Sequence, residues 1–77
     1  MRKMNKELEY AKCCLHDNSF EIDHLNEYCF RAKKGDVYFY DVYTKSKKGH
    51  FLHYTVFDWR TKKWTTLNEK QIEHLKI

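Results

Sequence analysis

The first half of the sequence contains two cysteine–histidine pairs that could supply metal ligands. Cys13 and His16 lie three residues apart, and His24 and Cys29 lie five apart. On a helix, a spacing of three places both side chains on one side, where they could reach the same zinc ion. The combined pattern matches no established zinc motif. We therefore expect ordinary packed or exposed side chains here, and we predict neither a metal site nor a cofactor.

Acid–base catalysis requires two titratable groups within hydrogen-bond reach, and the best candidates are Asp41 and His53. The alternation of the sequence predicts that they lie on paired strands and on the same face of a sheet. A single cross-strand pair is more commonly a local ion pair. The sequence adds no second carboxylate, no glycine-rich phosphate loop and no nucleophile with its base. We therefore predict a protein that is not an enzyme and has no catalytic residues.

Positive charge is concentrated in the second half of the chain. Between Thr44 and Thr66 there are six Lys or Arg and one acidic residue, so this stretch carries +5 whereas the whole chain carries +4. The cations fall in two expected loops, which lie at opposite ends of a meander. Such lysine-rich tips also serve solubility and protect sheet edges. The six residues are Lys45, Lys47, Lys48, Arg60, Lys62 and Lys63.

Aromatic residues are frequent between the two basic loops, and strict alternation divides the expected strands into two faces. One face is uncharged and is expected to pack under the helices: Tyr38, Tyr40, Val42, Leu52, Tyr54 and Val56. The other face contains charge and is expected to be open to solvent or a partner, or else covered by residues 19–34 or a second copy: Val37, Phe39, Asp41, Tyr43, Phe51, His53, Thr55 and Phe57.

Two tryptophans, Trp59 and Trp64, flank the second basic loop. Their rings could stack on nucleic-acid bases or enter a pocket of a protein partner. More commonly, such rings close the end of the sheet, here against Leu67 and the last helix. The sequence leaves both interpretations open.

The apolar residues at the start of the chain have the spacing of a helix. Met4, Leu8, Ala11 and Leu15 fall on one stripe, which predicts a helix over residues 3–15. This helix should end in the polar run at residues 16–19, whose short side chains compete for backbone hydrogen bonds.

Residues 19–34 fit two structures. A helix is favoured by signals at both ends, including the capping-box spacing of Asn18 and Glu21 and the position of Gly35 after the last turn. A strand is the alternative, because Phe30 and Ala32 would alternate with charged neighbours. We favour the helix because several end signals agree.

From residue 36 onward the period changes to two. Residues 37–44, 50–58 and 64–67 are predicted strands, joined by a polar link at 45–49 and a turn at 59–63. Asn68 can cap a last helix at 69–76. The prediction is one α+β domain over residues 1–77, with one or two N-terminal helices, a three-stranded antiparallel β-meander, or a four-stranded one, and a short C-terminal helix.

Length and composition limit the class of protein. A chain of 77 residues hides only about 60–65% of its unfolded surface, which leaves room for one small core and no separate catalytic domain. Rings must supply much of that core, since Phe, Tyr and Trp make up 17% of the residues. The sequence pI of about 9.0 favours a polyanion or an acidic protein surface as partner.

Cysteine usage and charge also suggest a compartment. Three cysteines form an odd set, and the adjacent Cys13 and Cys14 could hardly pair, which predicts free thiols in a reducing cytoplasm. Glu7 and Glu9 precede any apolar run long enough for a signal peptide or a membrane span, so we expect neither. The absence of proline with many Lys, Tyr and Asn is a compositional habit of AT-rich genomes, including those of many bacteriophages.

These observations favour a small binding protein. The first hypothesis is a nucleic-acid-binding module for single strands with weak sequence preference, in which cations contact phosphates and rings stack on bases. The second is a phage-type inhibitor that blocks a host nucleic-acid-handling or defence protein, with the rings as interface anchors. The third hypothesis is a homodimer whose sheets or aromatic faces pack together, with a structural or regulatory role. The expected contact residues are Lys45, Lys47, Lys48, Arg60, Lys62, Lys63, Phe39, Tyr43, Phe51 and Trp59.

Overall fold

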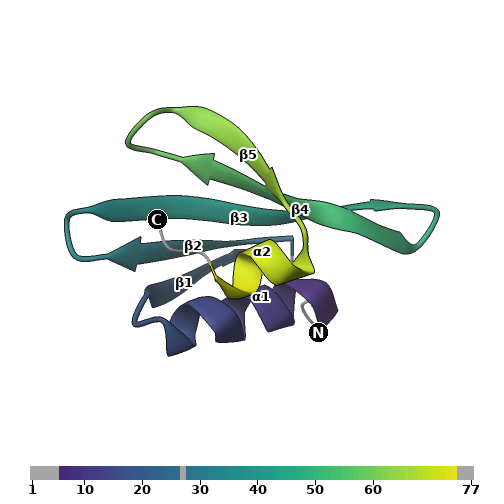
Figure 1. The fold of residues 1–77 in the computed structure, drawn as a ribbon, viewed down its shortest axis with the longest axis horizontal. Helices are drawn as coiled ribbons and strands as arrows, with labels where there is room; N and C mark the ends of the chain where they lie inside the picture. Colours follow the sequence, from purple (N-terminus) through teal and green to yellow (C-terminus); the bar gives the residue numbers. More distant parts are fainter. Residues whose placement is uncertain (1–5, 27, 75–77) are drawn as a thin grey trace.

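The computed structural model describes residues 6–26 and 28–74, which form one antiparallel sheet with two helices on one of its faces (Figure 1). The strand order is β1-β2-β3-β4-β5, an uninterrupted meander. The expected α+β class, N-terminal helix, meander and C-terminal helix are confirmed, but the sheet has five strands. The elements are α1 (Lys6–Asp17), β1 (Glu21–Asn26), β2 (Cys29–Lys34), β3 (Tyr38–Lys47), β4 (His50–Asp58), β5 (Lys63–Leu67) and α2 (Glu69–Glu73).

Helix α1 packs through the predicted stripe, in which Leu8, Ala11 and Leu15 are fully buried; Met4 lies outside the described residues. The helix ends in a Schellman motif. The Phe20 N–H donates to the Leu15 carbonyl at 3.0 Å, and Ser19 adopts a φ of 70° between them. The polar run therefore ends α1 and turns Phe20 into the core.

The favoured helix over residues 19–34 is wrong, because this segment forms the hairpin of β1 and β2. In β2, Phe30 and Ala32 face Val42 and Tyr40 of β3 and are 0% exposed. Burying one large apolar side chain contributes about 1.5–3 kcal/mol, whereas a helix cap contributes about 1 kcal/mol. Pairing with β3 therefore outweighs the local end signals, and Gly35, with a φ of 59°, serves the β2–β3 turn.

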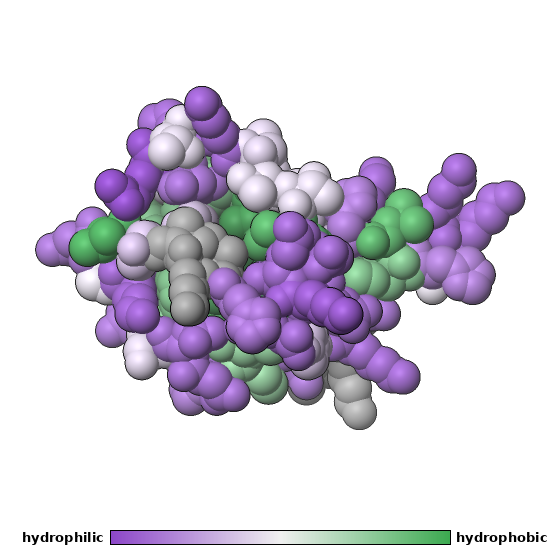
Figure 2. Space-filling view, in the orientation of Figure 1, coloured by the Kyte–Doolittle hydropathy of each residue, from purple (hydrophilic) through white to green (hydrophobic). Residues whose placement is uncertain are grey.

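The core lies between the helices and one face of the sheet, and its largest members come from the three central strands. The predicted covered-face residues Tyr40, Val42, Tyr54 and Val56 are all at most 2% exposed. Hydrophilic side chains cover much of the outer surface of the helices (Figure 2). The alternation therefore predicted the covered face correctly over the centre of the sheet.

Strands β3 and β4 continue beyond their neighbours as a two-stranded arm (Figure 1). Strand β2 pairs with β3 only as far as Tyr43, and β5 pairs with β4 only as far as Tyr54. The arm ends in a two-residue turn, Lys48 and Gly49, whose φ values are 51° and 81°. Positive φ at both positions is typical of a type I′ hairpin. The turn is thus shorter than the expected five-residue link.

An irregularity in the arm changes which side chains face the core. The pairing shifts so that Lys45 is opposite His53 while Ser46 is opposite Phe51. The extra residue, Leu52, breaks the alternation and is 49% exposed. Phe51 instead packs against the core, with its ring centroid 4.9 Å from that of Tyr54. The placements expected for Phe51 and Leu52 are therefore both wrong, and the bulge is the reason.

Helix α2 begins as predicted at Asn68. The Asn68 side chain accepts from the Gln71 N–H at 2.8 Å, and the Gln71 side chain accepts from the Asn68 N–H at 2.8 Å, which completes a capping box. Ile72 is 0% exposed, and Tyr10 of α1 donates a hydrogen bond to Glu73. The described part of α2 ends before the expected residues 75–76, which lie outside the described residues. Neither described helix has the length and apolar character needed to cross a membrane.

Candidate nucleic-acid interface

The face of the sheet opposite the helices carries a connected cluster of five rings, which we call the aromatic face: Phe39, Tyr43, Phe57, Trp59 and Trp64. Trp59 contacts Phe39 and Phe57 with ring centroids 5.8 and 4.9 Å apart. Trp64 contacts Phe57 and Tyr43 at 5.0 and 5.6 Å. Rings at these separations contribute more stability than the burial of their apolar area alone would give. The tryptophans therefore form the outer layer over the smaller rings.

Backbone pairing explains why the two tryptophans meet here. Trp64 is opposite Phe57 in the β4–β5 register, and the Trp59 N–H donates to the Phe39 carbonyl at 3.0 Å. The alternative in which they close the sheet against Leu67 and the last helix is wrong, because Leu67 packs against the core on the other face. Trp59 and Trp64 remain 39% and 59% exposed. Exposed contiguous apolar surface of this kind marks interaction sites.

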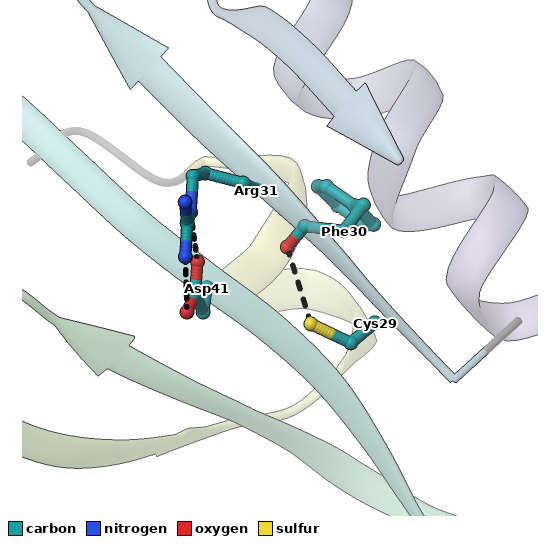
Figure 3. Close-up of polar contacts among 4 residues, drawn as sticks. All are labelled: Cys29, Phe30, Arg31 and Asp41. Carbon is teal, nitrogen blue, oxygen red and sulfur yellow. Dashed lines mark hydrogen bonds and ion pairs between the residues drawn. The ribbon is translucent and has the colours of Figure 1, made fainter. Parts of the chain in front are cut away.

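A partly buried ion pair lies within the aromatic face (Figure 3). Arg31 and Asp41 are opposite each other on β2 and β3, and Arg31 Nε donates to Asp41 Oδ1 at 2.9 Å while Nη2 donates to Oδ2 at 3.4 Å. Asp41 is 4% exposed. The hydrogen bond that Arg31 donates to Asp41 raises the pKa of Arg31, so the guanidinium is charged in all ordinary buffers.

The guanidinium of Arg31 also lies over two rings, with its central carbon 5.1 Å from the Phe39 centroid and 5.8 Å from that of Trp59. Cation–π contacts of this kind hold the charge in place above the rings. Asp41 and His53 lie on paired strands and on the same face, as predicted, but they are not opposite each other: Asp41 faces Phe57 on β4, while His53 is opposite Lys45 on the arm. The aromatic face therefore displays a fixed cation rather than an acid–base pair.

Cysteine and histidine side chains do not assemble into a metal site within residues 6–26 and 28–74, where no group of three potential ligands comes together. Cys13 and His16 do line a depression of about 580 Å³ between α1 and β1, with His24. Cys29 is instead 1% exposed, beside Tyr43, and its thiol contacts the Phe30 carbonyl at 3.9 Å (Figure 3). Burial raises the pKa of the Cys29 thiol, which keeps it protonated and unreactive at neutral pH.

Exposed cations lie between the two tryptophans in the chain: Arg60 and Lys62 in the β4–β5 turn, and Lys63 at the start of β5. Lys63 is opposite Asp58 and alternates with Trp64, so its side chain leaves β5 on the side of the helices. The turn is held by Asp58, whose carboxylate accepts from the Arg60 N–H at 2.8 Å and whose carbonyl accepts from the Lys62 N–H at 2.7 Å. Within the part of the chain that the structure describes, these three cations form no ion pair. They are available to an anionic ligand.

The structure thus gathers some of the predicted contact residues and separates others. Phe39, Tyr43 and Trp59 share one surface with the β4–β5 turn. Lys45, Lys47 and Lys48 lie on the arm, and Phe51 lies on the covered face.

Three members of the surface were missing from the predicted contact residues, namely Arg31, Phe57 and Trp64, although Phe57 was expected on this face. The register between β4 and β5 places Trp64 on the same face as Phe57, and the sequence alone does not give that register. Arg31 was assigned to the helix favoured over residues 19–34. The β1–β2 hairpin is what brings Arg31 to this face.

The same face has a depression of about 380 Å³ at its β1 side, lined by Glu21, Ile22, Asp23, Arg31, Lys33 and Phe39. Its walls carry both signs of charge. The acidic residues come from β1, and the cations come from β2. The positive, ring-bearing part of the face is therefore the part formed by β3, β4, β5 and the β4–β5 turn.

Comparison with known proteins yields no relative. No protein-family model, no curated protein and no solved structure matches the chain.

Proposed function

We propose that this protein binds single-stranded nucleic acid on the aromatic face. The observation that carries the proposal is the pair of exposed indoles, Trp59 and Trp64, layered on Phe39, Tyr43 and Phe57 next to the exposed cations of the β4–β5 turn. Stacking of a base on an aromatic side chain contributes about 1–3 kcal/mol and tolerates any base. The protein is proposed to act by binding, without catalysis.

The arrangement suits a single strand better than a duplex. Bases in a duplex are already stacked on one another, so exposed rings gain contact mainly with bases that are unstacked. The indoles lie on a sheet face, where successive bases can be laid out side by side, and Arg60 and Lys62 of the β4–β5 turn can neutralise neighbouring phosphates. Affinity should therefore depend on salt and little on sequence.

Fluorescence anisotropy with a labelled single-stranded oligonucleotide tests this proposal. Trp64→Ala should weaken binding about 5- to 150-fold, the equivalent of one lost stacking contact. Leu52→Ala is the control, because it removes a similarly exposed apolar side chain from the arm. Equal affinities for the wild type, Trp64→Ala and Leu52→Ala would contradict stacking on this face.

A protein partner is the other occupant that exposed Trp and Arg side chains could anchor. Capture from a host lysate, with and without nuclease treatment, separates the two. We expect nuclease to abolish capture. Nuclease-resistant capture of one stoichiometric protein, lost in Trp64→Ala, would replace the nucleic-acid proposal with that of an inhibitor or adaptor.

A further inference from the structure

The two-stranded arm differs in composition from the rest of the sheet. From Lys45 to His53 it contains three lysines, two histidines and no acidic residue. The nearest carboxylate along β3, Asp41, is buried against Arg31. The three lysines, Lys45, Lys47 and Lys48, are exposed and form no ion pair among the described residues. The arm therefore presents only positive charge.

The lysines of the arm continue the line of the aromatic face. Side chains two apart on a strand project to the same side, so Lys45 and Lys47 follow Phe39, Asp41 and Tyr43 along β3. His53 and His50 are paired with Lys45 and Lys47 and share their side. A nucleic acid lying on the aromatic face and extending along β3 would therefore reach these lysines.

The arm exposes no Phe, Tyr or Trp ring as a stacking platform. Its one Phe, Tyr or Trp side chain is Phe51, which the bulge directs toward Tyr54 and the core. The exposed apolar residue is Leu52, and a hydrophobic patch is visible on the arm in Figure 2. The remaining rings of the arm are the small imidazoles of His50 and His53, so the arm offers mainly cations. Cations suit a nucleic acid whose bases are already stacked. A two-stranded β-ribbon also has the width that the major groove of a duplex admits.

We propose that the arm binds the phosphate backbone of a duplex that adjoins the single strand on the aromatic face, so that the preferred ligand is a junction between single- and double-stranded nucleic acid. This inference rests on the proposed function for the single-stranded half of the ligand. The two surfaces contribute different contacts to one ligand. Linking two contacts in this way raises affinity well above that of either alone.

Three labelled probes test the inference by anisotropy: a single strand of about 12 nucleotides, a blunt duplex of similar length, and that duplex with the single strand as an extension. The wild type should bind the junction at least about tenfold more tightly than the single strand. The triple substitution Lys45→Ala, Lys47→Ala and Lys48→Ala should remove this advantage and leave the affinity for the single strand unchanged.

A matched variant controls for net charge. Lys6→Ala, Lys12→Ala and Lys70→Ala also removes three positive charges, from the two helices on the other face, and should preserve the preference for the junction. In the arm variant, the slope of log affinity for the junction against log salt should be shallower by about three. All three arm lysines are exposed, and circular dichroism checks that the variant remains folded.

The outcomes separate the inference from the proposed function. A wild type that binds the junction no more tightly than the single strand, or an arm variant that keeps the preference, overturns the role of the arm. If the single strand does not bind, the proposed function fails. In that case, weaker binding of the blunt duplex by the arm variant than by the charge-matched control still supports the arm, and equal binding overturns it.

Discussion

The two faces of this sheet use the same strands and both carry rings, yet they differ in what covers the rings. On the covered face, Phe30, Tyr40 and Tyr54 lie under the helices and are at most 2% exposed. On the aromatic face, rings cover rings, and the outermost, Trp59 and Trp64, remain exposed. Aromatic content alone therefore does not distinguish the core from the exposed face. The position of charge does, because the charged pair lies among the rings of the open face alone.

The largest predicted difference is in stability, and a matched pair of phenylalanines measures it. Phe30→Ala should lower the free energy of unfolding by about 3–5 kcal/mol, since it leaves a cavity in the core. Phe57→Ala should lower it by about 1–2 kcal/mol, because that ring is only partly buried, but should weaken oligonucleotide binding. Urea unfolding measures both. Equal losses of stability would mean that the two faces are equally part of the core.

The ion pair of the aromatic face should have the next largest effect. Asp41→Ala leaves Arg31 without its partner and should cost about 1–3 kcal/mol, less than for a fully buried pair because the Arg31 side chain is 33% exposed. A double-mutant cycle with Arg31→Ala isolates the coupling by denaturant unfolding. Strictly additive losses would show that Asp41 and Arg31 act independently, and the fixed cation above Phe39 would then lose its structural basis.

A hydroxyl on the covered face gives a smaller effect. The Tyr54 hydroxyl donates to the Glu7 carbonyl of α1 at 2.6 Å and so ties the helix to the sheet. Tyr54→Phe should lower the free energy of unfolding by about 1 kcal/mol, the usual contribution of one hydrogen bond. Oligonucleotide affinity should not change. A change in affinity without a change in stability would mean that the covered face takes part in binding.

Tyr40→Phe should have the smallest effect at neutral pH, because the buried Tyr40 hydroxyl has no hydrogen-bond partner among the described residues. Removing it should be neutral or slightly stabilising. Burial raises the pKa of Tyr40, so the folded state holds this proton more tightly than the unfolded state. Stability should therefore fall as the pH rises above about 10, the ordinary value for tyrosine. Urea unfolding across alkaline pH should show a shallower fall in Tyr40→Phe, whereas an unchanged profile would contradict this assignment.

The sequence predicted the parts of the fold in which local and long-range preferences agree. The stripe of Leu8, Ala11 and Leu15, the cap at Asn68 and the alternation along β3 all correspond to the structure. Because that alternation is regular, the placement of Phe39 and Tyr43 on the face opposite the helices followed directly.

Three features were not predictable because each depends on distant pairing. The hairpin of β1 and β2 replaces a locally favoured helix, since only the complete sheet offers Phe30 a core to enter. The bulge at Leu52 reverses the placement of Phe51. Trp64 joins the aromatic face through its register with Phe57. In each case the deciding contact lies outside the segment itself.

Tryptophan fluorescence tests the central claim most directly, because the chain has two tryptophans and both lie on the aromatic face. Titration with a single-stranded oligonucleotide should quench their emission in a saturable way, since stacked bases contact the indoles. A blunt duplex of equal length, bound at most by the arm, should leave the emission nearly unchanged. Unchanged emission with single strand up to about 0.1 mM, the weak end of non-specific nucleic-acid binding, would contradict binding on this face.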